Sequence, residues 1–123
     1  MKPLDSLVPM FHVESVPRSI EFYGKLGFVV GNTFTPPDQK EPIWAWLKSG
    51  GTHLMVVRAS EPVDARAQAV IFYIYCENVP SFRAELQKNG VKVGEIEYPF
   101  YNPKGEFRVS DTDGYALMIT HTA

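Results

Sequence analysis

The sequence is poor in cysteine, since Cys76 is the only one among its 123 residues. One thiol cannot form an internal disulfide, so nothing predicts secretion and we expect a cytoplasmic protein. A basic excess is absent too, because 12 Lys and Arg residues stand against 14 Asp and Glu residues, for a formal charge of −2. This balance argues against nucleic acid or an anionic membrane surface as a partner, because both are bound through basic patches.

Long hydrophobic runs are also missing. The longest, residues 69–76, is far shorter than the roughly twenty residues that cross a bilayer. The sequence contains no Gly-rich phosphate loop, nucleophile elbow or catalytic Cys–His pair, so no catalytic residue is predicted. With 45% hydrophobic and 21% charged residues, it is typical of a small soluble globular domain.

An internal repeat organises the chain. Val16-Pro17 recurs as Val79-Pro80, an offset of 79 − 16 = 63 residues. At this offset residues 12–31 align with residues 75–94 without a gap, and seven of the twenty pairs are identical. Average composition would give roughly one identity by chance. The sequence therefore predicts two copies of one module, spanning about residues 5–60 and 68–123 of a single domain.

Each copy has the same predicted elements. The predicted strands are residues 7–13, 28–34, 43–48 and 52–58 in the first copy, and 69–76, 92–98, 106–110 and 115–121 in the second. One helix per copy is predicted between an N-cap, Ser15 or Asn78, and a C-terminal glycine, Gly27 or Gly90. The pattern indicates an α+β fold of two tandem βαβββ modules.

Three short motifs resemble those of a known protein family. They lie at residues 16–23 (VPRSIEFY), 26–28 (LGF) and 111–115 (DTDGY). Together with the repeat they resemble the vicinal oxygen chelate superfamily of glyoxalases, bleomycin-resistance proteins and dioxygenases. Thr112 stands where that superfamily usually has proline. The resemblance implies an open eight-stranded mixed sheet curled around a central cavity, and it implies a fold more than an activity.

The resemblance also bears on metal binding. In this superfamily the metal, where present, is held by the first and last strands of each module, and the matching positions are Val8, Met55, Ile71 and Met118. None carries the imidazole, carboxylate or thiolate that divalent ions prefer, so the resemblance implies no metal and no cofactor. The alternative is a displaced two-histidine metal site, with candidate ligands His12, His53, Glu14 and Glu106.

Strand alternation predicts which side chains line the cavity. The predicted ligand-binding residues are Met10, His12, Met55, Tyr73, Tyr75, Phe100, Tyr101, Arg108 and Met118. Phe100 and Tyr101 belong to the Pro-rich segment 99–105, which is either a connector or a flap over the cleft. Trp44 and Trp46 are predicted on the helix-packed side, because the repeat aligns them with Phe107 and Val109. Alternatively, the predicted ligand-binding residues only fill the sheet interior or a dimer interface.

Among the branches of the superfamily, the metal-free bleomycin-resistance type is the most similar, through Val8-Pro9 and residues 105–107 (GEF). It implies a homodimeric, metal-independent protein that binds a small molecule, an antibiotic or aromatic metabolite. Arg108 and His12 favour a ligand with an anionic or hydrogen-bond-accepting group. The alternatives are a metal-dependent lyase or dioxygenase with a displaced site, and an interaction module with a filled cavity.

Overall fold

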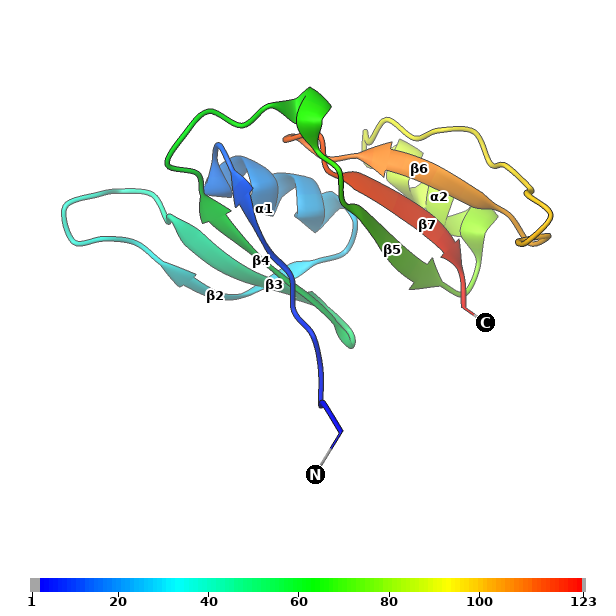
Figure 1. The fold of residues 1–123 in the computed structure, drawn as a ribbon, viewed down its shortest axis with the longest axis horizontal. Helices are drawn as coiled ribbons and strands as arrows, with labels where there is room; N and C mark the ends of the chain where they lie inside the picture. The colour runs from blue at the N-terminus through cyan, green and yellow to red at the C-terminus, as the bar shows by residue number, and fades with distance from the viewer. Residues whose placement is uncertain (1–2, 123) are drawn as a thin grey trace. The chain divides into compact units, whose positions relative to one another are not determined.

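The structure, a computed structural model, describes residues 3–122. The chain divides into two compact units, Met1–Val63 and Asp64–Ala123. Each unit consists of one sheet with one α-helix across one of its faces (Figure 1). Within the described residues no helix is both long and apolar enough to span a membrane.

The first unit contains β1 (Met10–Val13), α1 (Val16–Lys25), β2 (Val29–Phe34), β3 (Trp44–Ser49) and β4 (Thr52–Arg58). Its four strands lie in the order β1-β4-β3-β2, with β1 parallel to β4 and the other pairs antiparallel. Helix α1 begins where the Ser15 hydroxyl accepts a hydrogen bond from the Arg18 amide at 3.2 Å. It ends before Gly27, whose φ of 101° favours glycine.

The second unit contains the 3₁₀ turn η1 (Ala65–Ala67), β5 (Ile71–Cys76), α2 (Val79–Lys88), β6 (Glu106–Ser110) and β7 (Ala116–His121). Its strands lie in the order β5-β7-β6, with β5 parallel to β7. The Asn78 side chain accepts a hydrogen bond from the Ser81 amide at 2.9 Å and caps α2. Both helices and their N-caps are therefore as the sequence predicts.

One predicted strand, residues 92–98, is wrong. This segment runs beside β6 but pairs with it only through the Glu97–Glu106 bridge and a hydrogen bond from the Gly94 amide to the Arg108 carbonyl. The Gly94 carbonyl instead accepts a hydrogen bond from Arg83 Nε of α2 at 2.7 Å, so it is diverted from the strand ladder. The described residues thus form sheets of four and three strands, and the predicted eight-stranded sheet is not confirmed.

The cores lie between each helix and its sheet. In the first unit Tyr23 of α1 is fully buried and makes edge-to-face contacts with Phe11 and Phe28. In the second, Leu86 of α2 and the strand residues Phe107 and Ile119 are buried. We call the opposite face of each sheet, which carries no helix, its open face. Large apolar side chains remain exposed there, with Tyr73 at 48% and Tyr75 at 59% exposure.

The two tryptophans do not lie where the repeat places them. Trp44 and Trp46 face Val57 and Met55 across the β3–β4 pair, on the open face, while Ala45 between them is buried under α1. The cause is a difference of one residue in loop length between the modules. Four residues separate Lys48 from its partner His53, whereas five separate Ser110 from its partner Ala116, so the offset for β3 is 62 and not 63. A shift of one residue reverses every side chain of a strand.

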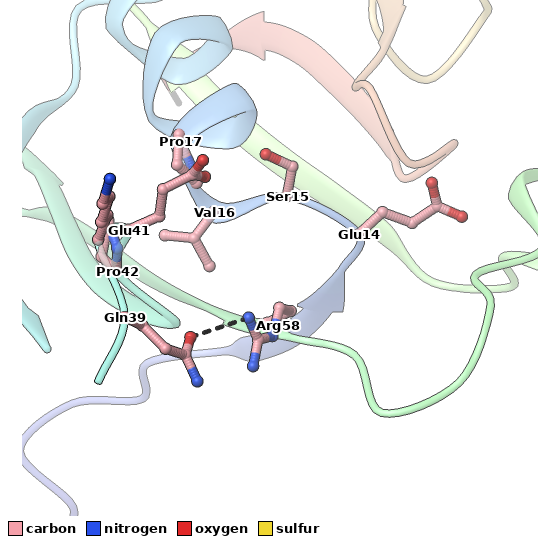
Figure 2. Close-up of a pocket in the computed structure, with 9 residues that line it drawn as sticks. Glu14, Ser15, Val16, Pro17, Gln39, Glu41, Pro42 and Arg58 are labelled. Carbon is pink, nitrogen blue, oxygen red and sulfur yellow. Dashed lines mark hydrogen bonds between the residues drawn. The ribbon is translucent and has the colours of Figure 1, made fainter. Parts of the chain in front are cut away.

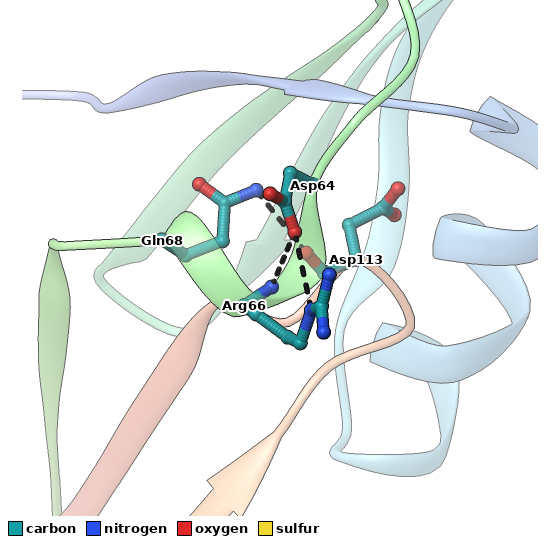
Figure 3. A network of polar contacts seen from close by, with 4 residues as sticks. All are labelled: Asp64, Arg66, Gln68 and Asp113. Carbon is teal, nitrogen blue, oxygen red and sulfur yellow. Dashed lines mark hydrogen bonds and ion pairs between the residues drawn. The ribbon is translucent and has the colours of Figure 1, made fainter.

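The motif at residues 111–115 closes the β6–β7 turn. Asp111 Oδ1 accepts hydrogen bonds from the amides of Asp113 and Tyr115, at 2.9 and 2.8 Å. Gln68 Nε2, just after η1, donates to the Asp113 carbonyl at 3.1 Å (Figure 3). Gly114 has a φ of 85°, and a Cβ there would collide with the backbone of Ala65. This motif is therefore structural, since it holds η1 against the turn.

Candidate functional site

The open face of the second sheet brings together four of the predicted ligand-binding residues, together with Glu106, which the sequence singles out only as an option. Cross-strand pairing forms two rows, one of Tyr73, Met118 and Arg108 and one of Tyr75, Thr120 and Glu106. Directly opposite side chains on one face lie within contact distance of each other. Tyr73, Met118 and Arg108 are therefore neighbours, as strand alternation predicts, and their role as ligand contacts stays a prediction.

A hollow of about 390 Å³ opens at one end of this face, and we call it the tyrosine hollow. Its lining residues are Tyr73, Tyr75, Tyr101, Asn102, Pro103, Lys104, Glu106, Thr120, His121 and Thr122. Three tyrosine rings around one recess form a surface for a flat apolar group. Phe100 does not line it, but packs edge-to-face on Tyr101, with ring centroids 5.4 Å apart, and is 97% exposed.

Asn102 and Glu106 form the polar floor of the tyrosine hollow. Glu106 is only 4% exposed, and its Oε1 accepts a hydrogen bond from Asn102 Nδ2 at 3.2 Å. The same amide nitrogen donates to Thr120 Oγ1 at 2.6 Å. The sequence singled out Glu106 only as an option and missed Asn102 and Thr120, because neither has a motif of its own.

Glycine at position 105 sets the course of the loop that carries Asn102. Gly105 has a φ of 95°, and a Cβ there would lie 2.8 Å from Ile96 and 2.9 Å from the Tyr98 ring. The Gly105 amide donates to the Asn102 carbonyl at 3.1 Å, which closes a turn. A residue with a side chain would therefore displace the loop and the amide above Glu106.

Nearby carboxylates raise the pKa of the Tyr101 phenol. Glu106 is the largest cause that raises the pKa of Tyr101 above its ordinary value, followed by burial and then by Tyr73 and Glu97. Phenolate formation beside a carboxylate is unfavourable, so Tyr101 keeps its hydroxyl proton at neutral pH. The tyrosine hollow therefore presents a neutral O–H group beside the Glu106 carboxylate.

The open face of the first sheet carries Met10, His12 and Met55, as predicted, together with the two tryptophans. His53 lies on this face too, and its Nδ1 accepts a hydrogen bond from Trp46 Nε1 at 3.0 Å. His12 faces Val57, four residues beyond His53 on β4, so the two histidines are about 13 Å apart along the strand direction.

The residues at the four positions that the resemblance matches to a metal do not fit a divalent ion. The four matched positions, Val8, Met55, Ile71 and Met118, offer only thioethers and hydrocarbon. Within residues 3–122 no three His, Cys, Asp or Glu side chains come close enough to share an ion. Among residues 3–122, therefore, no third ligand lies near His12 and His53 to complete the displaced metal site that the sequence left as an alternative.

A second hollow, of about 440 Å³, lies in the first unit and was not anticipated from the sequence. It is lined by Glu14, Ser15, Val16, Pro17, Gln39, Lys40, Glu41, Pro42 and Arg58. Arg58 Nη1 donates to Gln39 Oε1 at 3.1 Å, and the two side chains face each other at its edge (Figure 2). Its charges are of both signs and its arginine is engaged, so the tyrosine hollow is the better candidate for a small-molecule site.

A family model described as the Glyoxalase/Bleomycin resistance protein/Dioxygenase superfamily matches residues 7–119. No curated protein sequence matches.

Among solved structures, a bleomycin-binding protein complexed with bleomycin is similar, with a TM-score of 0.79 and 16% identity over 98% of this chain and 100% of that one. The bleomycin-binding protein of Streptomyces verticillus, complexed with copper(II)-bleomycin, has a TM-score of 0.75 and 18% identity over the whole of both chains. A glyoxalase family protein from Enterococcus faecalis has a TM-score of 0.73 and 21% identity over 96% of both chains. At these identities the likeness concerns the fold.

Proposed function

Because the chain belongs to the Glyoxalase/Bleomycin resistance protein/Dioxygenase superfamily, we propose that it binds a small aromatic molecule without a metal ion and sequesters it. The ligand class is an antibiotic or aromatic metabolite. The observation that carries the proposal is the tyrosine hollow, in which Tyr73, Tyr75 and Tyr101 surround one recess of about 390 Å³. That volume lies in the range of small-molecule sites.

Metal independence is part of the proposal. It is supported by the donor set at the four matched positions, which offers no imidazole, carboxylate or thiolate. The similarity of fold to proteins crystallised with bleomycin is further support for drug binding. No observation favours the lyase or dioxygenase alternative, since the tyrosine hollow holds one carboxylate, Glu106, already bonded to Asn102.

The proposal includes a homodimer in the cytoplasm, with ligand contacts as predicted from the sequence. The ligand contacts predicted from the sequence are kept as proposals within each unit, Met10, His12 and Met55 in the first and Tyr73, Tyr75, Phe100, Tyr101, Arg108 and Met118 in the second. Exposed apolar side chains on both open faces support burial against a second copy, because monomers seldom leave such surfaces bare.

A thermal-shift screen of planar aromatic antibiotics and metabolites tests the proposal. A ligand at a hundred times its dissociation constant stabilises the fold by about 2.7 kcal/mol, which raises the melting temperature. Tyr73→Ala should remove most of the shift given by the strongest compound, while Phe34→Ala, an exposed aromatic of the first unit, should keep it. An equal shift in both variants would reject the tyrosine hollow as the site.

A further inference from the structure

We infer that Lys92, Arg108 and Ser110 form an anion-binding subsite beside the tyrosine hollow. The ligand would then be an aromatic compound that bears a carboxylate, phosphate or sulfate group. This inference deepens the proposed function and rests on it for the aromatic part of the ligand. The sequence indicated Arg108 with His12, whereas the structure places Arg108 in a recess of its own with a second cation.

The recess has a volume of about 340 Å³ and is lined by Lys92, Val93, Gly94, Arg108 and Ser110. Arg108 and Ser110 alternate on β6 and so share the open face. Lys92 comes from the segment beside β6, which the hydrogen bond from the Gly94 amide to the Arg108 carbonyl holds in place at 2.9 Å. Two cations and a hydroxyl thus line one recess that has no carboxylate in its wall.

Arg108 differs from the other arginines of the chain. Arg58 bonds Gln39, Arg66 pairs with Asp64, Arg83 bonds Gly94 and pairs with Glu95, and Arg18 also has a partner. The guanidinium of Arg108 makes no hydrogen bond or ion pair with any residue between 3 and 122. A guanidinium has five donors and suits the planar recognition of carboxylate or phosphate, so its full donor set is available to a ligand.

Two carboxylates that are close to the recess in sequence, Glu106 and Glu95, have partners of their own. Glu106 lies two residues before Arg108 on the same face, about 7 Å along the strand, but its carboxylate is buried and accepts from Asn102. Glu95, next to the recess in sequence, lies 3.7 Å from Arg83 Nη2. These two acids therefore contact other residues, and among residues 3–122 no carboxylate lines the recess that holds Lys92 and Arg108.

The two recesses set the length of the ligand. Tyr73, Met118 and Arg108 are directly opposite one another on three adjacent strands, so Tyr73 and Arg108 are about 10 Å apart at their Cα atoms. A ligand whose aromatic end lies on the tyrosines and whose acid group lies within about 10 Å of them fits this spacing.

Isothermal titration with two isosteric probes, biphenyl-4-carboxylate and biphenyl-4-carboxamide, tests the subsite in the 123-residue protein. We expect the carboxylate to bind at least tenfold tighter than the amide. Arg108→Gln should weaken carboxylate binding about tenfold, or about 1.4 kcal/mol, and amide binding less than twofold. Lys92→Gln should weaken carboxylate binding about threefold, while Lys88→Gln, at the end of α2, should change neither.

Inorganic phosphate, followed by amide NMR shifts near Gly94, tests the subsite without the tyrosines. Saturable shifts in the millimolar range that Arg108→Gln abolishes would support the inference. If phosphate binds in this way and neither biphenyl probe binds, the subsite stands and the proposed aromatic ligand fails. Equal affinity for the two probes, or phosphate shifts that persist in Arg108→Gln, would overturn the inference while leaving the aromatic site intact.

Discussion

Replacing Asn102 with alanine tests the polar floor of the tyrosine hollow. The side chain amide gives the buried Glu106 carboxylate its hydrogen bond and also bonds the Thr120 hydroxyl. A bond to a charged group contributes about 1.5–3 kcal/mol, and a neutral one about 0.5–1.5 kcal/mol. Because Glu106 is only 4% exposed, little water can replace the lost donor, and we expect Asn102→Ala to cost about 2–3 kcal/mol.

Thermal unfolding followed by two probes measures this cost. Both tryptophans of the chain, Trp44 and Trp46, lie in the first unit, whereas far-ultraviolet circular dichroism reports on both units. The circular dichroism midpoint should fall by roughly 8–12 °C. If the units unfold separately, the tryptophan midpoint will not move with it.

A double-mutant cycle with Glu106→Gln isolates the charged bond, because removing both partners should cost less than the sum of the single changes by at least about 1 kcal/mol. Asn32→Ala is the matched control, since that side chain is exposed and, among residues 3–122, accepts a hydrogen bond only from the neighbouring Thr33 amide. We expect a change below about 0.5 kcal/mol. If Asn102→Ala is as mild as this control, the reasoning about the polar floor is refuted.

Three further predictions concern the turn, the phenol and the assembly. Gly114→Ala should destabilise the protein by at least about 2 kcal/mol in denaturant unfolding, because the φ of Gly114 is 85° and Ala65 leaves no space for a Cβ. Gly51→Ala should not destabilise it, because the space around Gly51 is open, and equal effects of the two variants would contradict the turn contact. In an ultraviolet titration the pKa of Tyr101 should lie above its ordinary value and should fall in Glu106→Gln, and an unchanged titration would exclude Glu106 as the cause. Because the folded-state pKa is raised, the free energy of unfolding should drop as pH rises from about 10 through that pKa. Light scattering should give twice the chain mass of 13.9 kDa at micromolar concentration, and a mass of one chain would reject the homodimer.

The helices could be predicted because their signals are local. Ser15 and Asn78 cap the helices through amides three residues later, which any chain with these residues at the start of an apolar helical pattern can do. The register between β1 and β4 and between β5 and β7 also follows the repeat, since Met10 pairs with Met55 as Tyr73 pairs with Met118.

The errors arise where one distant residue decides the outcome. The strand predicted at residues 92–98 fails because Arg83, in the preceding helix, takes the Gly94 carbonyl, and strand propensity does not reveal such a contact. The prediction of the sheet face for Trp44 and Trp46 is wrong because the β6–β7 loop is one residue longer than the β3–β4 loop, which changes the repeat offset.

The candidate site was predictable only on its strands. Alternation places Tyr73 and Tyr75 on the open face, because period two follows from strand geometry alone. Asn102 and Lys92 reach the open face from irregular segments whose paths depend on Gly105 and on the backbone of β6. No periodic pattern describes such segments, so only the structure reveals these two contacts.

The most direct test of aromatic binding without metal is titration calorimetry of the strongest aromatic ligand from the screen, with protein dialysed against a chelator. We predict the same dissociation constant with chelator and with added zinc or manganese. Tyr75→Ala should weaken binding about tenfold, since each ring contact adds about 0.5–1.5 kcal/mol beyond the area it buries. Binding that requires the metal, or that Tyr75→Ala leaves unchanged, would contradict the proposed function.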